Sequence, residues 1–233
     1  MKALLELAHI YKTYEKKESG RRQILHDVSL SVAPGEAVAL TGPSGSGKST
    51  LARIASGFEK PDSGNVLFME NPVSGPDRSA GRRYFSQVQM IWQDPKVYLN
   101  PYLPVLTLIT EPMLAQGGHS KSVCRKRAYH LMEALGLDTS LENLKPGGLS
   151  GGQCQRIALA RALSVSPRLL ICDEALVSLD LVRQARTIRL LKGLREKDGL
   201  SLLFITHDRA GAGILCQRRF HLDQGSIREY SSV

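Results

Sequence analysis

The stretch Gly42-Pro43-Ser44-Gly45-Ser46-Gly47-Lys48-Ser49-Thr50 directly follows the apolar run 37–40. It matches the pattern G-x-x-x-x-G-K-[ST], a phosphate-binding loop between a strand and a helix. The context agrees, because an aliphatic strand is predicted before it and an apolar-periodic helix after it. Glycines let the backbone turn tightly and direct its N–H groups at phosphate oxygens, while the helix N-terminus adds positive partial charge.

The side chains of this loop have separate expected roles. Lys48 is expected to reach the β- and γ-phosphates, and Ser49 to offer its hydroxyl to Mg²⁺. The whole loop is predicted to bind a nucleotide, through Gly42, Pro43, Ser44, Gly45, Ser46, Gly47, Lys48, Ser49 and Thr50. Alone, it does not distinguish a kinase, a GTPase and a motor protein.

Composition places the chain among soluble globular proteins. Its 233 residues suffice for one large domain or a domain with a subdomain, with 42% hydrophobic and 23% charged residues. The net charge of +9 indicates either an anionic partner or a solvated basic face. No apolar run approaches the roughly 18 residues of a membrane helix. Glu6 interrupts what would be a signal peptide, so a cytoplasmic chain is expected.

The four cysteines show no metal-ligand or disulfide pattern. They lack C-x-x-C and Cys/His spacing, so we expect reduced thiols, either in the core or on the surface, at Cys124, Cys154, Cys172 and Cys216.

Strands and helices are predicted to alternate along most of the chain. This favours a largely parallel sheet covered by helices. A basic loop is expected at 75–83, and a helical insert begins after the proline-rich segment 94–104. Strands are predicted at 4–14, 24–32, 65–69, 88–92, 169–173, 200–206 and 219–223, and helices at 106–116, 121–135 (capped by Ser120), 152–165 and 181–197.

A second motif, Leu149-Ser150-Gly151-Gly152-Gln153, stands at the entry to a predicted helix. Ser150 can donate its hydroxyl, and the two glycines expose backbone N–H groups at the helix N-terminus. A flexible loop would also account for the Ser-Gly-Gly sequence at 150–152. A match at all five positions of this motif rarely arises by chance, which favours a second anion-binding site.

With both motifs, the sequence resembles the ATP-binding subunits of ABC transporters over essentially its whole length. The phosphate loop looks like their Walker A, residues 149–153 their signature, and 169–174 their Walker B. Four single residues match further family positions in the family's order: Tyr14 the adenine-stacking aromatic, Gln93 the Q-loop, Asp180 the D-loop and His207 the switch histidine.

The resemblance implies an α/β fold, a P-loop NTPase of ABC type. We expect a mostly parallel sheet core with an antiparallel β-subdomain and a helical insert. One domain would span 1–233, with a catalytic core at about 1–93 and 154–233 and a helical subdomain at about 94–153.

The resemblance also implies hydrolysis of ATP to ADP and phosphate. Ser49, Gln93 and Asp173 would hold Mg²⁺. Glu174 would polarise the attacking water or serve as a second carboxylate near the metal, and His207 would contact the γ-phosphate. These groups supply the positioning and charge stabilisation that phosphoryl transfer requires.

Partners are implied in the same way. Two ATPase chains would sandwich ATP head to tail, so that one chain's phosphate loop faces Ser150, Gly151, Gly152 and Gln153 of the other. The second ATPase would be a different chain. Two integral-membrane permease subunits would hold the pair peripherally at the cytoplasmic face of the bacterial inner membrane. An extracytoplasmic solute-binding protein would act indirectly, and no nucleic acid is expected.

One segment departs from the family pattern. Glu174 is usually followed by Pro-Thr-Ser-Ala-Leu-Asp, whereas this chain has Ala175-Leu176-Val177-Ser178-Leu179-Asp180. The aspartate is kept, so the departure bears on communication between the two sites and not on hydrolysis itself.

Further matches indicate the peptide/nickel importer branch. One recurring sequence of that branch is found here as Gln93-Asp94-Pro95 followed by Leu99-Asn100-Pro101. A second similarity, to the second ATPase subunit of nickel importers, covers residues 180–184 and 203–208. The chain ends at Val233, without the cysteine-containing extension usual in peptide members. We therefore expect import of nickel or a metal chelate. The alternatives are an oligopeptide or dipeptide importer and a soluble ABC ATPase of DNA repair or translation.

The proline-rich segment carries apolar residues that could receive the permease. Val97, Tyr98, Tyr102 and Leu103 are expected either to form this docking patch or to pack within the helical insert.

Overall fold

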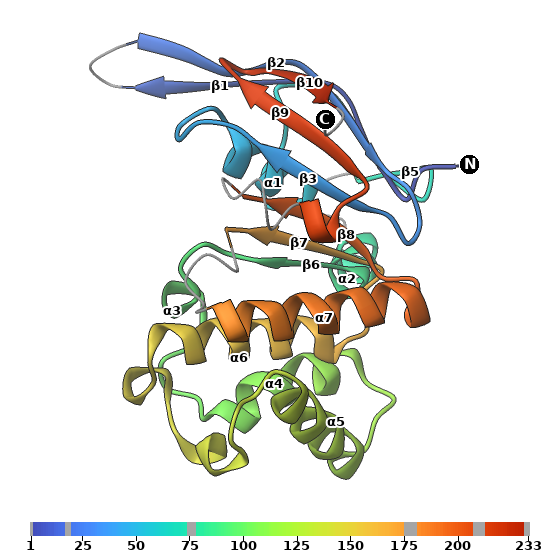
Figure 1. Ribbon diagram of the computed structural model, residues 1–233. Helices are drawn as coiled ribbons and strands as arrows, with labels where there is room; N and C mark the ends of the chain where they lie inside the picture. Colours follow the sequence, from blue (N-terminus) through green and yellow to red (C-terminus); the bar gives the residue numbers. More distant parts are fainter. Residues whose placement is uncertain (1, 17–19, 74–77, 175–180, 207–212, 231–233) are drawn as a thin grey trace.

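A computed structural model of the chain describes residues 2–16, 20–73, 78–174, 181–206 and 213–230 (Figure 1). Its central sheet has the strand order β10-β9-β3-β8-β7-β6. All neighbours are parallel except β10, which is antiparallel to β9. The strands are β3 (Ala37–Thr41), β6 (Val88–Ile91), β7 (Leu169–Asp173), β8 (Ser201–Ile205), β9 (Arg218–Asp223) and β10 (Ser226–Tyr230).

The three strands β3, β7 and β8 are buried along their whole length. This explains their unbroken apolar sequences, because a parallel strand covered on both faces has no solvent side.

A second sheet is antiparallel and has the order β2-β1-β4-β5. Its apolar side chains share one core cluster with Val38 and Leu40 of β3 and with helix α1. The strands are β1 (Leu5–Lys16), β2 (Gly20–Val32), β4 (Ser63–Phe68) and β5 (Asn71–Pro72). The expected combination of a mostly parallel core and an antiparallel β-subdomain is confirmed.

The helices divide between the two parts of the molecule. α1 packs against the central sheet in the upper half of Figure 1, whereas α4 and α5 lie below α6, away from that sheet. The helices are α1 (Lys48–Ala55), α2 (Arg78–Gln87), α3 (Pro95–Tyr98), α4 (Val105–Gln116), α5 (Lys121–Ala134), α6 (Gly151–Ser164) and α7 (Leu181–Asp198), with 3₁₀ turns at Thr139–Asn143 and Pro146–Gly148.

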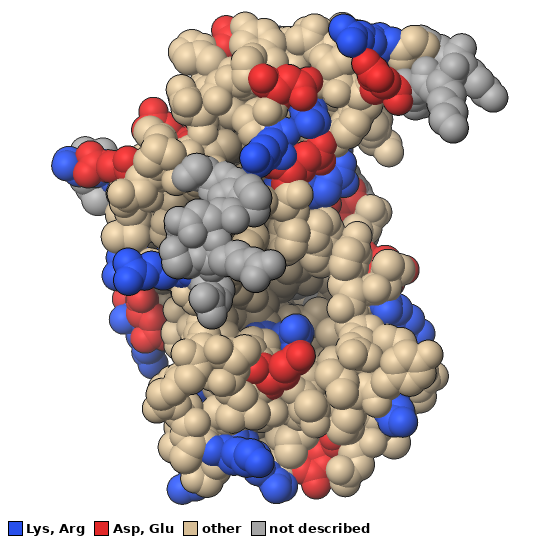
Figure 2. Space-filling view, turned by 180° about the vertical axis from the view of Figure 1, so that it is seen from behind, with Lys and Arg blue, Asp and Glu red and all other residues tan. Residues whose placement is uncertain are grey.

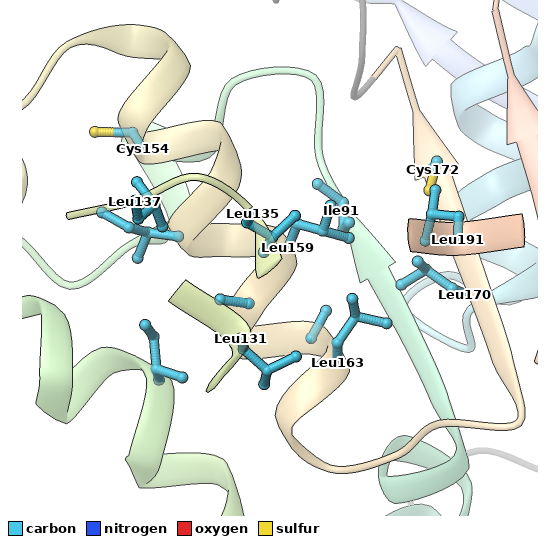
Figure 3. Packing of buried hydrophobic residues seen from close by; sticks show 14 of the residues in the cluster. Ile91, Leu131, Leu135, Leu137, Cys154, Leu159, Leu163, Leu170, Cys172 and Leu191 are labelled. Atoms are coloured by element: carbon cyan, nitrogen blue, oxygen red, sulfur yellow. The ribbon is translucent and has the colours of Figure 1, made fainter. Parts of the chain in front are cut away.

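One apolar cluster joins the helical layer to the sheet (Figure 3). Leu159 and Leu163 of α6 lie between Leu131 of α5 and strand residues such as Ile91 and Leu170. All four cysteines are buried free thiols, so of the two expected environments the structure shows the core.

Two arginines hold the C-terminal end of α5. Arg186 of α7 donates to the carbonyls of Glu133 (2.6 Å) and Ala134 (3.0 Å). Arg156 of α6 donates to those of Leu135 (3.3 Å) and Gly136 (2.5 Å). The last carbonyls of a helix have no partner within it, so these contacts satisfy α5 and fix it to two other helices.

The prediction of a loop at 75–83 is wrong from residue 78 onward, because α2 begins at Arg78. Burial of Tyr84 explains the difference. Its ring packs edge-on against Phe68 at 5.3 Å, and its hydroxyl donates to the carbonyl of Ala55. The basic segment has no helical pattern of its own, so these tertiary contacts stabilise the helix. The short helix α3 and the last strand β10 were also not predicted.

No helix in the described ranges is long and apolar enough to cross a lipid bilayer. On the face shown in Figure 2, basic and acidic side chains are interspersed. This face therefore looks like an ordinary solvated surface and not like a single anion-binding patch.

Candidate functional site

The phosphate loop joins the end of β3 to the start of α1 through glycines in conformations that side chains disfavour. Gly42, Gly45 and Gly47 have φ values of 151°, 78° and 108°. A Cβ atom at Gly42 would lie 2.1 Å from the carbonyl oxygen of Leu222. The loop thus starts in direct contact with the backbone of β9, which only glycine permits.

Lys48 lies inside this loop, with only 7% of the residue exposed. Its Nζ donates to the carbonyls of Gly42 (2.9 Å) and Pro43 (2.8 Å). Burial lowers the pKa of the Lys48 ammonium, although the nearby carboxylates of Glu174 and Asp173 act in the opposite direction. The cation is therefore held where the loop motif requires positive charge.

The Ser46 hydroxyl indicates that the loop is built for a polar ligand. Its Oγ is buried and has no hydrogen-bond partner within the described part of the chain. Leaving a buried hydroxyl unpaired costs on the order of 1–3 kcal/mol. A phosphate oxygen in the loop would supply the acceptor, so the residues present fit a nucleotide phosphate.

Asp173, at the end of β7, lies beside the first turn of α1. It is 4% exposed, and its carboxylate is hydrogen-bonded by the Ser49 side chain. Burial raises the pKa of Asp173 and the charge of Glu174 adds to this, while Ser49, Lys48 and Arg53 oppose it. A buried carboxylate paired with a hydroxyl is an oxygen donor set that suits Mg²⁺.

Glu174 and Gln93 meet although 81 positions separate them in the sequence. The Gln93 Nε2 donates to the Glu174 Oε2 at 2.7 Å. Glu174 has a φ of 52°, and its N–H donates to the carbonyl of Ile205 on β8 at 3.0 Å. A left-handed conformation at a residue other than glycine is strained, which is common at functional sites.

Tyr14, on β1, is half-buried and is linked to the helix that carries Lys48. Its hydroxyl donates to Glu59 Oε1 at 2.5 Å and accepts from Arg53 Nη2 at 3.3 Å. The same Arg53 nitrogen donates to Thr50 Oγ1 at 3.1 Å. The structure thus connects the predicted adenine-stacking residue to the last residue of the phosphate loop.

The signature residues form a regular helix start. Ser150 is the N-cap of α6, and its Oγ accepts from the Gln153 N–H at 3.2 Å while the Gln153 Oε1 accepts from the Ser150 N–H at 2.8 Å. Gly151 is exposed, and a Cβ added to it would meet no atom of the described residues within 4 Å. The packing of this chain alone therefore does not require a glycine at that position.

The structure does not bring the two glycine-rich motifs together. Among the described residues, no hydrogen bond or ion pair joins 150–153 to 42–50, and Figure 1 shows α6 and α1 in different layers. Asp180, His207 and the departing segment 175–178 lie outside the described residues.

The family described as ABC transporter matches residues 25–177, well over half of the chain. The chain belongs to the ABC transporter family. A relative, the nickel import ATP-binding protein NikE of Shigella dysenteriae serotype 1 (strain Sd197), is 44% identical over 218 residues, which are 92% of this chain and 81% of that protein.

Solved ABC cassettes share the fold. A dimeric structure of MJ0796, a bacterial ABC transporter cassette, has a TM-score of 0.91 and 32% identity, covering 97% of this chain and 98% of that one. Its post-hydrolysis state bound to ADP and Pi gives a TM-score of 0.90 with the same identity and coverage. The chain is therefore an ABC-type ATPase subunit, and the predictions of family, fold class and enzyme class are confirmed.

Two groups near the ABC phosphate loop were not predicted. Arg53 and Glu59 bind the Tyr14 hydroxyl. Behind the loop, Thr41 Oγ1 contacts His221 Nδ1 (3.2 Å) and the Tyr230 hydroxyl (3.1 Å). Neither group forms a motif, because its members come from separate elements that only the tertiary fold brings together.

The buried charge of Asp173 gives a testable pH dependence. Its raised pKa means that the native state holds this proton more tightly than the unfolded chain does. This carboxyl's contribution to stability therefore falls as pH rises from the unfolded pKa through the folded one. We expect Asp173→Asn to raise the Tm of nucleotide-free protein at neutral pH, and a gain of about 1 kcal/mol would appear as roughly 2–4 °C.

Thermal unfolding measured between pH 4 and 8 tests this, and the difference from wild type should shrink toward the acidic end. Glu196→Gln, which alters an exposed carboxyl on α7, should leave Tm unchanged. A lower Tm for Asp173→Asn at neutral pH would show that attraction to Lys48 and Arg53 outweighs the cost of burial.

Proposed function

We propose that this chain is the ATP-hydrolysing subunit of an ABC importer for nickel or a nickel chelate, bound peripherally at the cytoplasmic face of the bacterial inner membrane. One observation supports hydrolysis above all others: Gln93 Nε2 donates to Glu174 Oε2 at 2.7 Å, next to the buried Asp173, which is hydrogen-bonded by the partly buried Ser49. The assignment of nickel rests on the relative named as a nickel import protein, which matches 92% of the chain.

The loop residues bind and orient the triphosphate. The backbone N–H groups of 42–50 and the Lys48 ammonium lie along the β- and γ-phosphates, and Ser46 Oγ donates to a phosphate oxygen. Tyr14 stacks on adenine. Because these groups are already positioned in the free protein, binding requires little rearrangement.

Ser49, Asp173 and Gln93 would hold Mg²⁺, which would supply positive charge to offset that of the phosphate oxygens. Glu174 accepts a proton from the water that attacks the γ-phosphorus, while the bond to the ADP oxygen breaks. The Gln93 amide keeps the Glu174 carboxylate in place. His207 contacts the γ-phosphate oxygens, as its match to the family's switch histidine implies.

The signature completes the site of another chain. The capping box preforms the start of α6, and no residue of the described ranges crowds the space beside Gly151. Backbone N–H groups at an exposed helix start bind phosphate, so Ser150, Gly151, Gly152 and Gln153 face the γ-phosphate on a partner ATPase. MJ0796, which is similar to this chain, has been solved as a dimer. The proposed partner is a different ATPase chain, and Asp180 is assigned a role at their contact only by its match to the family's D-loop.

An exposed aromatic surface beside Gln93 forms the docking site for the permease subunits. Val97 and Tyr102 are 71% and 80% exposed, and the half-exposed Tyr98 stacks on Trp92 at 4.4 Å. Phe58 lies 5.2 Å from Trp92 and is 58% exposed. Leu103, in contrast, packs partly against the core. Exposed apolar clusters of this kind are typical of protein interfaces.

Replacing Glu174 by Gln tests the hydrolytic role. The amide cannot accept the proton of the attacking water, so ATP turnover of the assembled importer should fall by about 10²-fold or more. Nickel uptake should stop, while ATP binding persists. Full uptake by this variant would reject the assignment, and Glu6→Gln, at an exposed carboxyl of β1, should behave as wild type.

The head-to-tail arrangement predicts that two substitutions silence different sites. In the complex with the second ATPase, Lys48→Ala should weaken nucleotide binding at this chain's loop by about tenfold or more, through loss of a charge-assisted contact. Ser150→Arg should instead impair the partner's loop. Photolabelling with an azido nucleotide would identify the affected chain, with Ser122→Arg on α5 as the control. Loss at the same loop in both variants would contradict the arrangement.

The docking surface is tested by placing one charge on it. Val97→Asp should reduce co-purification with the membrane permease subunits and nickel uptake, because a carboxylate would have to be desolvated there. ATP binding by the isolated chain should be unchanged. Val123→Asp makes the same change at a 49% exposed valine of α5 and should have no effect. Equal loss in both variants would argue against a specific surface, and no association of wild type with any permease would favour a soluble ABC ATPase.

A further inference from the structure

The Tyr14 hydroxyl belongs to a closed set of hydrogen bonds with Arg53 and Glu59, here called the Tyr14 triangle. Tyr14 donates to Glu59 Oε1 (2.5 Å), and Arg53 donates through Nη2 to Tyr14 (3.3 Å) and through Nε to Glu59 Oε2 (3.0 Å). The phenol uses its one hydrogen and one lone pair, so the orientation of its ring is fixed.

A lysine reinforces the triangle and covers one side of the ring. Lys12 Nζ lies 3.3 Å from Glu59 Oε1 and over the Tyr14 ring, 5.6 Å from its centroid. It also donates to the carbonyl of Lys60 at 2.8 Å and to Asp62 at 3.3 Å. One face of the ring is thus occupied by a cation, so a planar ligand would stack on the other face.

Glu59 is suited to anchor this arrangement at neutral pH. Its side chain is 19% exposed. Burial by itself raises the pKa of Glu59, but the bonds from Tyr14, Arg53 and Lys12 outweigh burial and hold that pKa below its usual value. The carboxylate therefore stays ionised and remains the acceptor for its donors.

Arg53 extends the triangle to the phosphate loop. Its Nη2 donates to Thr50 Oγ1 at 3.1 Å, and Thr50 is 6% exposed on the first turn of α1. Tyr14 on β1 and the loop before α1 are thereby tied through one guanidinium. The separation between the aromatic ring and the phosphate-binding N–H groups is set before any ligand arrives.

We propose that Glu59 and Arg53 are positioning residues that orient Tyr14 against a purine base, and so set the base's share of nucleotide affinity without touching the nucleotide. The inference rests on the proposed role of Tyr14 in ATP binding. If the proposal holds, removing the Tyr14 hydroxyl weakens ATP binding even when the ring is kept. Stacking alone would need only the ring.

The test compares a ligand that has a base with one that lacks it. Calorimetry on the full chain should give an ATP Kd about fivefold weaker for Glu59→Gln, which is about 1 kcal/mol. Inorganic tripolyphosphate, which reaches the loop but not Tyr14, should bind Glu59→Gln within about twofold of wild type. Glu15→Gln removes an exposed carboxylate from the residue next to Tyr14 and should change neither affinity.

Tyr14→Phe keeps the ring and removes the hydroxyl. It should lose ATP affinity as Glu59→Gln does, and the double variant should lose little more, because both changes break the same contact. Wild-type ATP affinity in Tyr14→Phe would overturn the inference, as would an equal loss of tripolyphosphate affinity in Glu59→Gln. If Tyr14→Ala also binds ATP normally, the stacking role of Tyr14 itself fails. If only Tyr14→Ala is impaired, the stacking role stands and the positioning role fails.

Discussion

The parallel pairing of β3, β8, β7 and β6 is the constraint on which the site depends. Parallel strands end at the same edge of a sheet, and ligands of open α/β folds bind there. Lys48 and Gln93 follow β3 and β6, and Asp173 is the last residue of β7, so residues up to 125 positions apart in sequence, from 48 to 173, face one region. The buried apolar runs of β3, β7 and β8 hold that edge in register.

The charged side chains at this edge are buried at a cost in folding free energy. Lys48 is held by loop carbonyls, and burial lowers its pKa, whereas burial raises the pKa of Asp173. Both shifts oppose the charged forms that phosphate and metal binding use. A ligand carrying the complementary charge relieves both, so the site gives up stability in the free chain in favour of binding.

The same region borders the exposed aromatic surface. Gln93 contacts Glu174, while its neighbour Trp92 stacks on Tyr98 and lies beside Phe58. A displacement of Gln93 would therefore reach these rings through one peptide bond. The cluster in Figure 3 packs α5 against α6, and Arg156 and Arg186 tie the C-terminal end of α5 to α6 and α7.

The alternation of strands and helices around the glycine-rich loop predicted an α/β fold, because apolar periodicity, glycine-rich turns and helix caps are local properties of the sequence. The ABC type and the roles of the motif residues came from the resemblance to a family. The cap at Ser120 and the strand at Leu169–Asp173 were predicted with the observed residues. Contacts between distant elements, in contrast, stabilise the helix at 78–87, join Gln93 to Glu174, and bring Arg53 and Glu59 to the Tyr14 hydroxyl. These depend on side chains from different elements meeting within hydrogen-bond distance, which no spacing along the chain encodes.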